Sequence, residues 1–397
     1  MTDTTATTAV PDRAEILRRA REVTPVLRNN APWGDENRRL SKETVSVLAD
    51  AGLLRTRIPR RLGGFEVDMR TQAELLVELA RADGAASWTA GVWSISAWVA
   101  ALFPDEVQDR VLASPDALVS GIISPTATAV PVDGGILVNG SWKFNSGVQH
   151  STWDTNAAVL LTPDAAPRPI MTLIPVSDLE VVDDWHTVGL RGSGSVTTVA
   201  RDVFVPAERY IPMEPVMIGG GGAGSNAGSE IYRAPIMPTA CATVSATALG
   251  LAIAAKDAFF ERLPDRRITY TDYTDQREAP LTHLQVAEAA VKIDEAEFHC
   301  YRLADLVDAK NAAAEPWTLE ERALARLETG AVCARVKEAV DILATASGAS
   351  SVYLDVPIQR IERDVRTLHL HAVMHPNTNL ELYGRLLCGQ APNTQYL

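Results

Sequence analysis

Three histidines lie close together near the end of the chain, at positions 369, 371 and 375. An imidazole can donate, accept or transfer a proton near neutral pH, so each is a candidate for acid–base chemistry. His371 and His375 would share one face if a helix continued through them, and this spacing also occurs between zinc ligands. However, Pro376 disfavours helical geometry at His375, and no third ligand lies nearby. We therefore expect no metal here, and we expect His369 to be structural.

Two carboxylates, Glu362 and Asp364, precede these histidines by about two turns of the expected helix. A carboxyl group whose pKa is raised by burial could remove a proton from a substrate. Arg363 and Arg366 lie beside the two acids, and we expect them to hold the carboxylates in ion pairs. A base at Glu362 or Asp364 remains an open alternative.

A second group of candidates lies in mid-chain, where residues 142–147 read Trp-Lys-Phe-Asn-Ser-Gly. On a strand, a period of two would place Trp142, Phe144 and Ser146 on one face. The same period would place Lys143 and Asn145 on the other face. Ser146 would lie at the edge of the strand, where an ordinary strand-end turn is the alternative interpretation. Aromatic residues on a strand also commonly belong to the core.

Two glycine-rich segments follow, at 189–195 and 219–228. Within the first, Arg191 either orients the chain as it leaves the strands or pairs with Asp183 or Asp184. The second would need a preceding strand, a following helix and a Lys-Ser/Thr pair to cradle a phosphate, and these are missing. Its composition instead predicts a flexible linker.

The elements that must position these residues change in character along the 397-residue chain. From about 13 to 113 the apolar residues recur with a helical period, and Ser41 begins one such helix as its cap. Residues 85–102 are apolar nearly all round, which predicts a buried helix. From 130 to 212, short alternating segments between turn signals predict strands. The helical period then returns in long segments at 246–260, 285–307, 320–346 and 359–388.

Composition narrows the class of protein. The net charge of −13 argues against nucleic acid or an anionic membrane as a partner. No apolar run approaches the ~18 residues of a membrane span, and the N-terminus lacks the pattern of a signal peptide. We therefore expect a cytoplasmic protein. The wide spacing of the cysteines predicts reduced, mostly buried thiols at Cys241, Cys300, Cys333 and Cys388.

Taken together, the motifs resemble the acyl-CoA dehydrogenase superfamily. They are residues 142–147, the Val-Gly-Leu-Arg-Gly-Ser-Gly-Ser run at 188–195, and the Arg-Asp and Thr-Leu-His-Leu-His-Ala segments at 363–372. The resemblance implies an α+β fold in four parts. These are an N-terminal helical domain (1–118), a middle β-barrel (119–213), a glycine-rich linker (214–229) and a C-terminal four-helix bundle (230–397). The superfamily's habit of pairing bundles also implies a homotetramer.

Position 372 divides the superfamily by its chemistry. Where its dehydrogenases carry a glutamate base, this chain has Ala372, preceded by His371. With Ser146, this is similar to the oxygenase component of two-component flavin monooxygenases. Such an oxygenase receives diffusible reduced FMN or FAD from a separate NAD(P)H:flavin reductase. The flavin reacts with O2 to give a C4a-hydroperoxide, which oxygenates a small-molecule or natural-product substrate at an aromatic carbon or an amine nitrogen.

The resemblance also assigns roles to residues of this chain. His371 would hydrogen-bond the hydroperoxide and shuttle its proton, and Ser146 would reach the flavin N5 and C4 carbonyl. Arg266 and Gln285 would meet the flavin phosphates of an adjacent subunit. The full set of expected flavin contacts is Trp142, Phe144, Asn145, Ser146, Arg266, Gln285, Gly348 and Ala349. The usual Gln-Phe-Gly after the arginine is replaced by 268–270, Ile-Thr-Tyr, which fits a flavin that is held less permanently.

The expected substrate pocket contains Trp88, Ser96 and His375. Several phenol-hydroxylating relatives have a histidine at the position of Ser96, so its absence argues against a plain phenol as substrate. Two alternatives stay open. One is an acyl-CoA dehydrogenase or oxidase with a displaced base, and the other is a non-catalytic relative that binds flavin or a partner.

Overall fold

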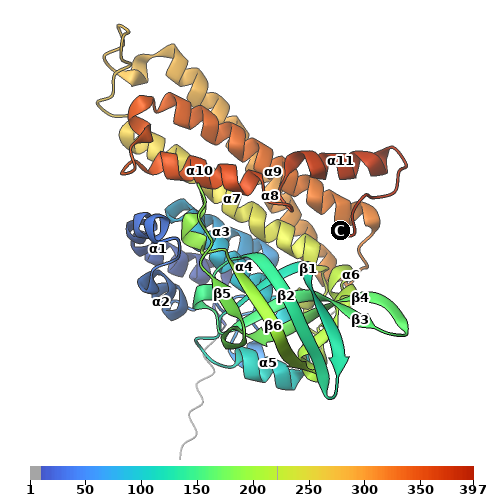
Figure 1. The fold of residues 1–397 in the computed structure, drawn as a ribbon. Coiled ribbons are helices and arrows are strands. Elements are labelled where there is room, and N and C mark those ends of the chain that lie inside the picture. Colours follow the sequence, from blue (N-terminus) through green and yellow to red (C-terminus); the bar gives the residue numbers. More distant parts are fainter. Residues whose placement is uncertain (1–9, 221) are drawn as a thin grey trace, which may run out of the picture.

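The computed structural model describes residues 10–220 and 222–397. Figure 1 shows the N-terminal helices and a sheet on one side of a diagonal group of long helices. In the described residues, five α-helices precede the sheet: α1 (Arg13–Asn37), α2 (Lys42–Asp50), α3 (Met69–Ala82), α4 (Gly84–Ala100) and α5 (Asp105–Leu112). The predicted cap of α2 is confirmed, because the side chain of Ser41 accepts a hydrogen bond from the Thr44 N–H at 3.0 Å.

Helix α4 is buried on nearly every side, as its sequence predicts. It contacts α3, the sheet and the long helix α7 (Ile236–Arg262). Its tryptophans Trp88, Trp93 and Trp98 are all less than a tenth exposed. A helix with polar residues on one face could not occupy this position without leaving unpaired polar groups in the core.

The middle of the chain forms one mixed seven-stranded sheet. Its strands are β1 (Val119–Val132), β2 (Gly135–Asn145), β3 (Trp153–Thr162), β4 (Ala165–Pro175), β5 (Glu180–Val182), β6 (Val196–Pro206) and β7 (Tyr210–Pro212). They lie in the order β5-β6-β2-β1-β3-β4-β7, and all neighbours are antiparallel except β1 and β3. Among the described strands, the two edge strands do not pair with each other. The expected β-barrel is therefore seen only as an open sheet.

The end of β2 departs from the expected alternation. The register against β6 shifts between Trp142 and Asn145, and Phe144 has a φ of 65°. Trp142 and Asn145 consequently both point inward and are fully buried, whereas Phe144 is 64% exposed. The prediction that Trp142 and Phe144 share one face was wrong, because a bulge adds a residue and reverses the alternation.

The C-terminal region is helical. After the short helix α6 (Met213–Ile218), it contains α7, α8 (Pro280–Ala313), α9 (Leu319–Ala346), α10 (Pro357–His369) and α11 (Pro376–Leu387). A single helix over 359–388 was expected, but α10 ends at His369 and α11 starts at Pro376. Proline fits the first turn of a helix and interrupts one that is already formed. The break places His371 in the turn between the two helices.

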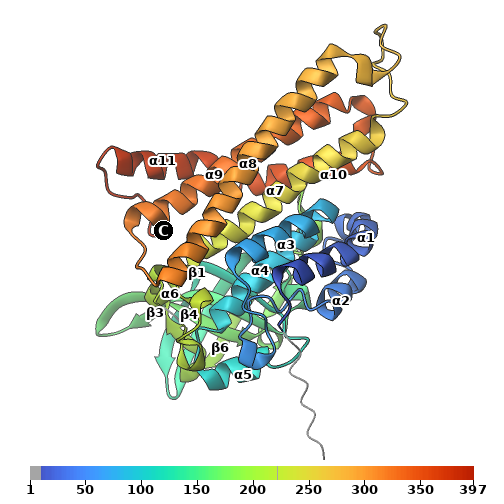
Figure 2. The ribbon, with the colours of Figure 1, turned by 180° about the vertical axis from the view of Figure 1, so that it is seen from behind.

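Helix α7 runs through the core of the fold, where it packs against α3, α8 and α9 (Figure 2). It is long and apolar enough to cross a membrane by length and composition, contrary to the expectation that no such run exists. However, 94% of its most apolar window is buried inside the fold. The apolar character is therefore accounted for by packing within the protein.

The glycine-rich run is fastened to the N-terminal helices rather than free. Ser225 donates through its N–H and hydroxyl to the carboxylate of Asp105, with the hydroxyl contact at 2.6 Å. Asn226 is buried and donates to the carbonyl of Ala101. Residue 221 within this run lies outside the described residues. The three boundaries between the four expected parts stay predictions, although helices give way to strands near 119 and strands to helices near 213.

The thiols are as predicted. All four cysteines are free, with Cys241, Cys300 and Cys333 buried and Cys388 exposed.

Candidate active site

The indole of Trp88 joins the two residues expected to be catalytic. Its Nε1–H donates to Ser146 Oγ at 2.9 Å. Its ring also meets the imidazole of His371 edge to face, with 5.1 Å between the ring centroids and 73° between the planes. Helix α4, the end of β2 and the turn after α10 therefore converge at one place. We call the group of Ser146, Trp88, His371, Ser193 and Ser195 the Trp88 centre.

Gly147 allows α4 to approach Ser146 this closely. It directly follows Ser146 and has a φ of 73°, a conformation that favours glycine. A Cβ at this position would lie 2.6 Å from both Thr89 Cγ2 and Trp93 Nε1. Any side chain here would push α4 away and break the Trp88–Ser146 hydrogen bond. The Ser-Gly pair in the sequence is thus a packing requirement as well as a chemical one.

A chain of hydroxyl groups leads from Ser146 into the loop before β6. Ser146 Oγ lies 2.6 Å from Ser195 Oγ, and Ser195 Oγ lies 2.7 Å from Ser193 Oγ. Ser193 Oγ in turn donates to the carbonyl oxygen of Leu190 at 2.7 Å. We did not predict a role for Ser193 or Ser195 from the sequence. The available signal was that the Gly-Ser-Gly-Ser motif carries serine at both positions.

The turn that carries His371 is held by a buried arginine. Arg326 of α9 donates to the carbonyl of Ala372 at 3.2 Å and to Asn379 Oδ1 at 2.9 Å. Asn379 itself donates to the carbonyl of Val373 at 2.9 Å. The position of His371 is thus fixed from both α9 and α11, although no helix contains it.

His371 is a neutral imidazole at physiological pH. Burial, aided by the nearby Arg326 guanidinium, lowers the pKa of His371 to about 4. Its Nδ1 accepts a hydrogen bond from the Val373 N–H at 3.3 Å, which leaves the ring proton on Nε2. In the described part of the chain Nε2–H has no partner, so it can donate to a ligand. The expected change of charge of His371 near neutral pH is therefore not supported by this structure.

The loop at 189–195 is anchored on α10. A Cβ on Gly189 would lie 2.0 Å from the Arg363 carbonyl oxygen, so only glycine permits this contact. Next to it, the Leu190 N–H donates to Asp364 Oδ1 at 2.5 Å. Burial raises the pKa of Asp364 to about 7. Asp364 thus holds the loop that carries the two serines.

The ion pairs expected around Asp364 are different from those observed. Arg363 pairs with Asp35 of α1, with Nη2 and Oδ2 2.9 Å apart, and Glu362 is exposed. Within residues 10–220 and 222–397, neither Arg363 nor Arg366 pairs with Glu362 or Asp364. These partners are remote in sequence, so the pairing could not be read from local spacing.

Of the two alternatives for Arg191, the pairing with Asp183 or Asp184 is not seen among the described residues, and Arg191 instead lies 3.7 Å from Asp35 Oδ1. Its Nε donates to the carbonyl of Asp35 at 2.7 Å, which ties the serine loop to α1.

Three residues expected near the flavin ring do not join the Trp88 centre. Trp142 is fully buried, and its Nε1–H donates to the Ala157 carbonyl at 2.8 Å, so it offers no face to a ligand. Asn145 is also fully buried and donates to Asp154 Oδ2 at 2.6 Å. Phe144 turns outward and packs against Trp185, with 6.0 Å between ring centroids. The assignment of Trp142 as a wall of the flavin site gains no support from this position and stays a prediction.

The other two residues expected in the substrate pocket, Ser96 and His375, are near Trp88 and His371 in the sequence. Ser96 is buried on α4, one helix with Trp88, and its hydroxyl has no hydrogen-bond partner among the described residues. His375 precedes α11, and its Nδ1 is buried without a partner. The ring centroid of His375 lies 6.1 Å from that of His369. Both Ser96 and His375 stay predictions as substrate contacts.

No metal site is evident in the described part of the chain, where no group of three or more potential ligands occurs.

The remaining expected flavin contacts gather at one end of the helical bundle. Arg266 donates to the carbonyl of Ser347, directly after α9, and a Cβ on Gly348 would lie 3.4 Å from its Nη2. Arg262 donates to Ser350 Oγ at 3.1 Å. We call this region, residues 262–266 and 347–350 with Gln285, the bundle tip. Figure 1 shows this end of the bundle projecting away from the sheet.

Positive charge at the bundle tip is not neutralised by the chain itself. Burial lowers the pKa of Arg266, and the neighbouring Arg262 lowers it further. Neither arginine forms an ion pair with a carboxylate in the part of the chain that the structure describes. Arg262 Nη1 is buried and has no partner. Two guanidinium groups in this state favour a bound anion, and a phosphate matches their geometry.

Gln285 faces a cavity at the same end of α9. The cavity has a volume of about 320 Å³ and is lined by Gln285, Glu288, Asp341, Ile342 and Thr345. Thr345 lies two residues before Ser347, so the expected phosphate contacts Arg266 and Gln285 lie near the other two expected flavin contacts, Gly348 and Ala349.

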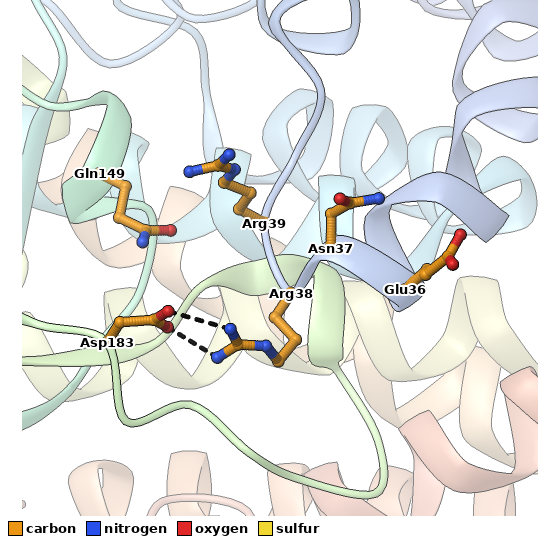
Figure 3. Close-up of a pocket in the computed structure, with 6 residues that line it drawn as sticks. All are labelled: Glu36, Asn37, Arg38, Arg39, Gln149 and Asp183. Carbon is orange, nitrogen blue, oxygen red and sulfur yellow. Dashed lines mark hydrogen bonds and ion pairs between the residues drawn. The ribbon is translucent and has the colours of Figure 1, made fainter.

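A separate polar cavity of about 250 Å³ lies between α1 and the turn that follows Ser146 (Figure 3). It is lined by Glu36, Asn37, Arg38, Arg39, Gln149 and Asp183, and Arg38 pairs with Asp183 across it at 2.6 Å. None of the expected site residues lines this cavity. We therefore do not assign it to the Trp88 centre.

Two family matches cover most of the chain. Residues 13–114 match the acyl-CoA dehydrogenase N-terminal domain, and residues 242–376 match the acyl-CoA dehydrogenase C-terminal domain.

The chain is also similar to known proteins over nearly its whole length. The oxygenase subunit HsaA of a flavin-dependent monooxygenase from Mycobacterium tuberculosis is 31% identical over 96% of this chain and 97% of its own. The oxygenase component of the FADH2-dependent resorcinol hydroxylase from a Rhizobium species is 29% identical, with 96% of each chain covered. The structure of XiaF from a Streptomyces species, in complex with FADH2 and glycerol, has a TM-score of 0.90 at 30% identity, covering 96% of this chain and 97% of that one.

Proposed function

Since the chain belongs to the acyl-CoA dehydrogenase superfamily, among its flavin-dependent monooxygenases, we propose that the Trp88 centre is where it oxygenates its substrate. The protein is the oxygenase component of a two-component system and uses reduced flavin and O2. The observation that supports this location is the indole of Trp88, which touches both Ser146 and His371. These are the two residues on which the resemblance to the oxygenases rests.

The residues present fit a flavin. Ser146 Oγ uses one of its two lone pairs for Trp88, and His371 Nε2–H has no partner in the described chain, so both can still bind a ligand. Arg262 and Arg266 at the bundle tip are two unneutralised cations, as a phosphate requires. When bound, the reduced flavin supplies the electrons that activate O2.

The chain's own residues position groups and exclude water. Trp88 fixes the rotamer of Ser146 and packs against the edge of His371, so neither side chain is free to turn away. Neutral His371 offers a hydrogen bond without placing a charge beside the ligand. The buried aromatic surroundings of α4 keep water from the reacting groups, which limits the loss of reducing equivalents as hydrogen peroxide.

We propose an aromatic substrate that is oxygenated at carbon. The relatives act on aromatic compounds by name, among them resorcinol and indole-3-acetate. Oxidation of an amine nitrogen has no such support. Ser96 supports a substrate other than a simple phenol, because a hydroxyl is a weaker base than an imidazole for removing a phenolic proton. A natural-product substrate stays part of this proposal.

The dehydrogenase alternative lacks a base. Ala372 cannot take a proton, and its carbonyl is bound by Arg326. Asp364, the buried carboxyl group nearest in sequence, is engaged with the Leu190 N–H. An acyl-CoA dehydrogenase with a displaced base therefore has no observed candidate among the described residues.

We also propose that the protein is a homotetramer in which the bundle tip of one subunit completes the flavin site of another. The partly unneutralised Arg262 and Arg266 support this arrangement. So does a row of exposed apolar side chains on α8, namely Leu281, Leu284, Val291 and Phe298. A separate reductase follows from the two-component class, and a cytoplasmic location is proposed from the sequence.

Oxygen uptake tests the function directly. The purified protein should consume O2 and convert aromatic substrates only when reduced FAD or FMN is supplied. In stopped-flow mixing with O2, an absorbance distinct from those of reduced and oxidised flavin should appear transiently. Bleaching of bound oxidised flavin by acyl-CoA thioesters would instead establish a dehydrogenase. Absence of both reactions, with flavin still bound, would establish a non-catalytic relative.

A further inference from the structure

The hydroxyl chain behind Ser146 has a fixed direction, because each of its ends can act in only one way. At one end the Trp88 Nε1–H can only donate, and it donates to Ser146 Oγ at 2.9 Å. At the other end the Leu190 carbonyl can only accept, and it accepts from Ser193 at 2.7 Å. Each serine between them has a single proton to donate.

The direction follows link by link. Ser193 uses its proton on Leu190, so the 2.7 Å contact with Ser195 requires Ser195 to donate. Ser195 has then used its only proton. The 2.6 Å contact between Ser195 and Ser146 can therefore be a hydrogen bond only if Ser146 is the donor. Among the described residues, the one other acceptor within reach of Ser146 Oγ is the Phe144 carbonyl at 3.4 Å, which is long for an O–H···O bond.

Ser146 is consequently left as an acceptor toward any ligand. Its proton is held by Ser195, and one of its two lone pairs is taken by Trp88. The remaining lone pair can bind only a group that carries a hydrogen. Reduced flavin carries a hydrogen on N5, whereas N5 of oxidised flavin has only a lone pair. The two redox forms thus differ in the group that Ser146 can accept.

We propose that Ser195 and Ser193 are positioning residues that keep Ser146 an acceptor and thereby make the site selective for reduced over oxidised flavin. The proposal rests on the proposed function, since it assumes that flavin binds at Ser146. Neither serine has to touch the flavin. Both serines are at most 4% exposed, and the loop that carries them is fixed on α10 through Asp364. The series of hydroxyl groups therefore cannot easily rearrange.

The test compares the dissociation constants of oxidised and anaerobically reduced flavin. In Ser195→Ala the Ser146 proton loses its acceptor and can turn toward the flavin, so oxidised flavin gains a hydrogen bond. The dissociation constant of oxidised flavin divided by that of reduced flavin should therefore fall by about tenfold, the equivalent of one hydrogen bond. The midpoint potential of the bound flavin should fall by ~30 mV, the value of a tenfold change for two electrons.

Ser193→Ala provides a second variant one link further away. Ser195 would then be free to donate to Ser146, and the Ser146 proton would again turn toward the flavin. The ratio should therefore fall about as much as in Ser195→Ala, although residue 193 is more distant. An effect confined to Ser195→Ala would indicate local disturbance and would overturn the proposal. Ser195→Thr, which keeps the hydroxyl group, should retain the selectivity of the wild type.

A double-mutant cycle separates orientation from general structure. With Ser146→Ala as background, Ser195→Ala should no longer change the ratio, because there is no hydroxyl left to orient. An equal change in both backgrounds, or no change in either, would overturn the proposal. The proposed function fails separately, if the wild type binds neither redox form of flavin. Circular dichroism and thermal unfolding establish that each variant is folded.

Discussion

The Trp88 centre and the bundle tip differ in how their polar groups are satisfied. At the centre, the hydroxyl groups of Ser146, Ser195 and Ser193 are hydrogen-bonded one to the next. The last hydrogen bond of this series goes to a backbone carbonyl, that of Leu190. At the tip, Arg262 and Arg266 lie together with no carboxylate partner in the described chain. The centre is thus organised within one chain before any ligand arrives. The tip has binding capacity that only a further partner or ligand can use.

Under the proposed function, this difference predicts that the Trp88 centre controls the reaction and that the bundle tip contributes to flavin binding. Groups that control chemistry must be held to a fraction of an ångström. If the Trp88 centre has the proposed role, α4, the end of β2, the loop before β6 and the turn after α10 hold its groups in this way within one chain. Groups that only retain a charged tail tolerate looser geometry, since a guanidinium attracts a phosphate over a wider range. Substitutions at the centre should therefore affect coupling of the reaction, and substitutions at the tip should affect flavin affinity.

The largest effect is expected for His371→Ala. Loss of the neutral donor should lower product formation on the order of 100-fold, the range of an acid–base group, while O2 is returned as hydrogen peroxide. Flavin affinity should change little. The measurement is the ratio of product to hydrogen peroxide during turnover with supplied reduced flavin. His369→Ala is the matched control, because it removes a neighbouring imidazole that does not contact Trp88, and equal uncoupling in both would contradict a specific role for His371.

Arg266→Gln should produce the opposite pattern. Removing one charged hydrogen-bond donor should weaken binding of reduced flavin by roughly tenfold, whereas coupling at saturating flavin should be unchanged. Anaerobic titration followed by fluorescence measures the affinity. Arg277→Gln serves as the control, because this exposed arginine of the same connection pairs with Asp275 and with no other carboxylate among the described residues. Uncoupling without a change in affinity would show that the tip acts on chemistry and would break the comparison.

Asp364→Asn tests the anchor of the serine loop through pH. The folded pKa of Asp364, about 7, is above its model-peptide value of 3.8, so its carboxyl group stabilises the fold fully below pH 3.8. This contribution is lost as the pH rises through about 7. The variant keeps an acceptor for the Leu190 N–H and bears no charge. Its melting temperature should therefore exceed that of the wild type at pH 8 by several degrees, and the difference should vanish near pH 4.

The exposed Asp355→Asn, just ahead of α10, is the matched control for this pH series. It should show no difference that grows with pH. A constant difference between Asp364→Asn and the wild type would mean that the carboxyl group titrates alike in the folded and unfolded states.

The smallest effect is expected for Trp142→Phe. The lost hydrogen bond to the Ala157 carbonyl should cost about 1 kcal/mol of the free energy of unfolding. The affinity for flavin should not change, because Trp142 faces the core. Chemical denaturation and flavin titration measure the two quantities, and Phe144→Leu is the control on the exposed side of the same strand. A loss of affinity in Trp142→Phe alone would restore the role first predicted for it.

Some features of the fold and of the candidate site could be predicted from the sequence, and others could not. Helices with a clear apolar period, such as α2 with its Ser41 cap, lie where the pattern placed them. Ser146 and His371 were found through motif resemblance, and the structure brings both to Trp88. The predictions that were wrong concerned features set by a single bulge residue in a strand or by a partner far away in the sequence. The bulge before Asn145 reversed the faces of β2, and a hydrogen-bonding pattern of this kind leaves little trace in residue types.

Long-range pairing was the second source of error. Arg363 was expected to pair within its own helix but reaches Asp35, more than three hundred residues away. Ser193 and Ser195 escaped notice because serines between glycines are typical of any turn. Their significance depends on Leu190 and Ser146, which only the folded chain brings to them.

The anchor between Asp364 and Leu190 has a consequence for how the protein is made. Asp364 and His371 belong to the last tenth of the 397 residues, so they leave the ribosome after every other part of the Trp88 centre. Domains generally fold from the N-terminus as they are synthesised. Ser146 and the serine loop must therefore wait for α10 before they are fixed. An unfinished or truncated chain accordingly lacks both His371 and the Asp364 anchor of the serine loop, so the Trp88 centre is completed only when synthesis is nearly finished.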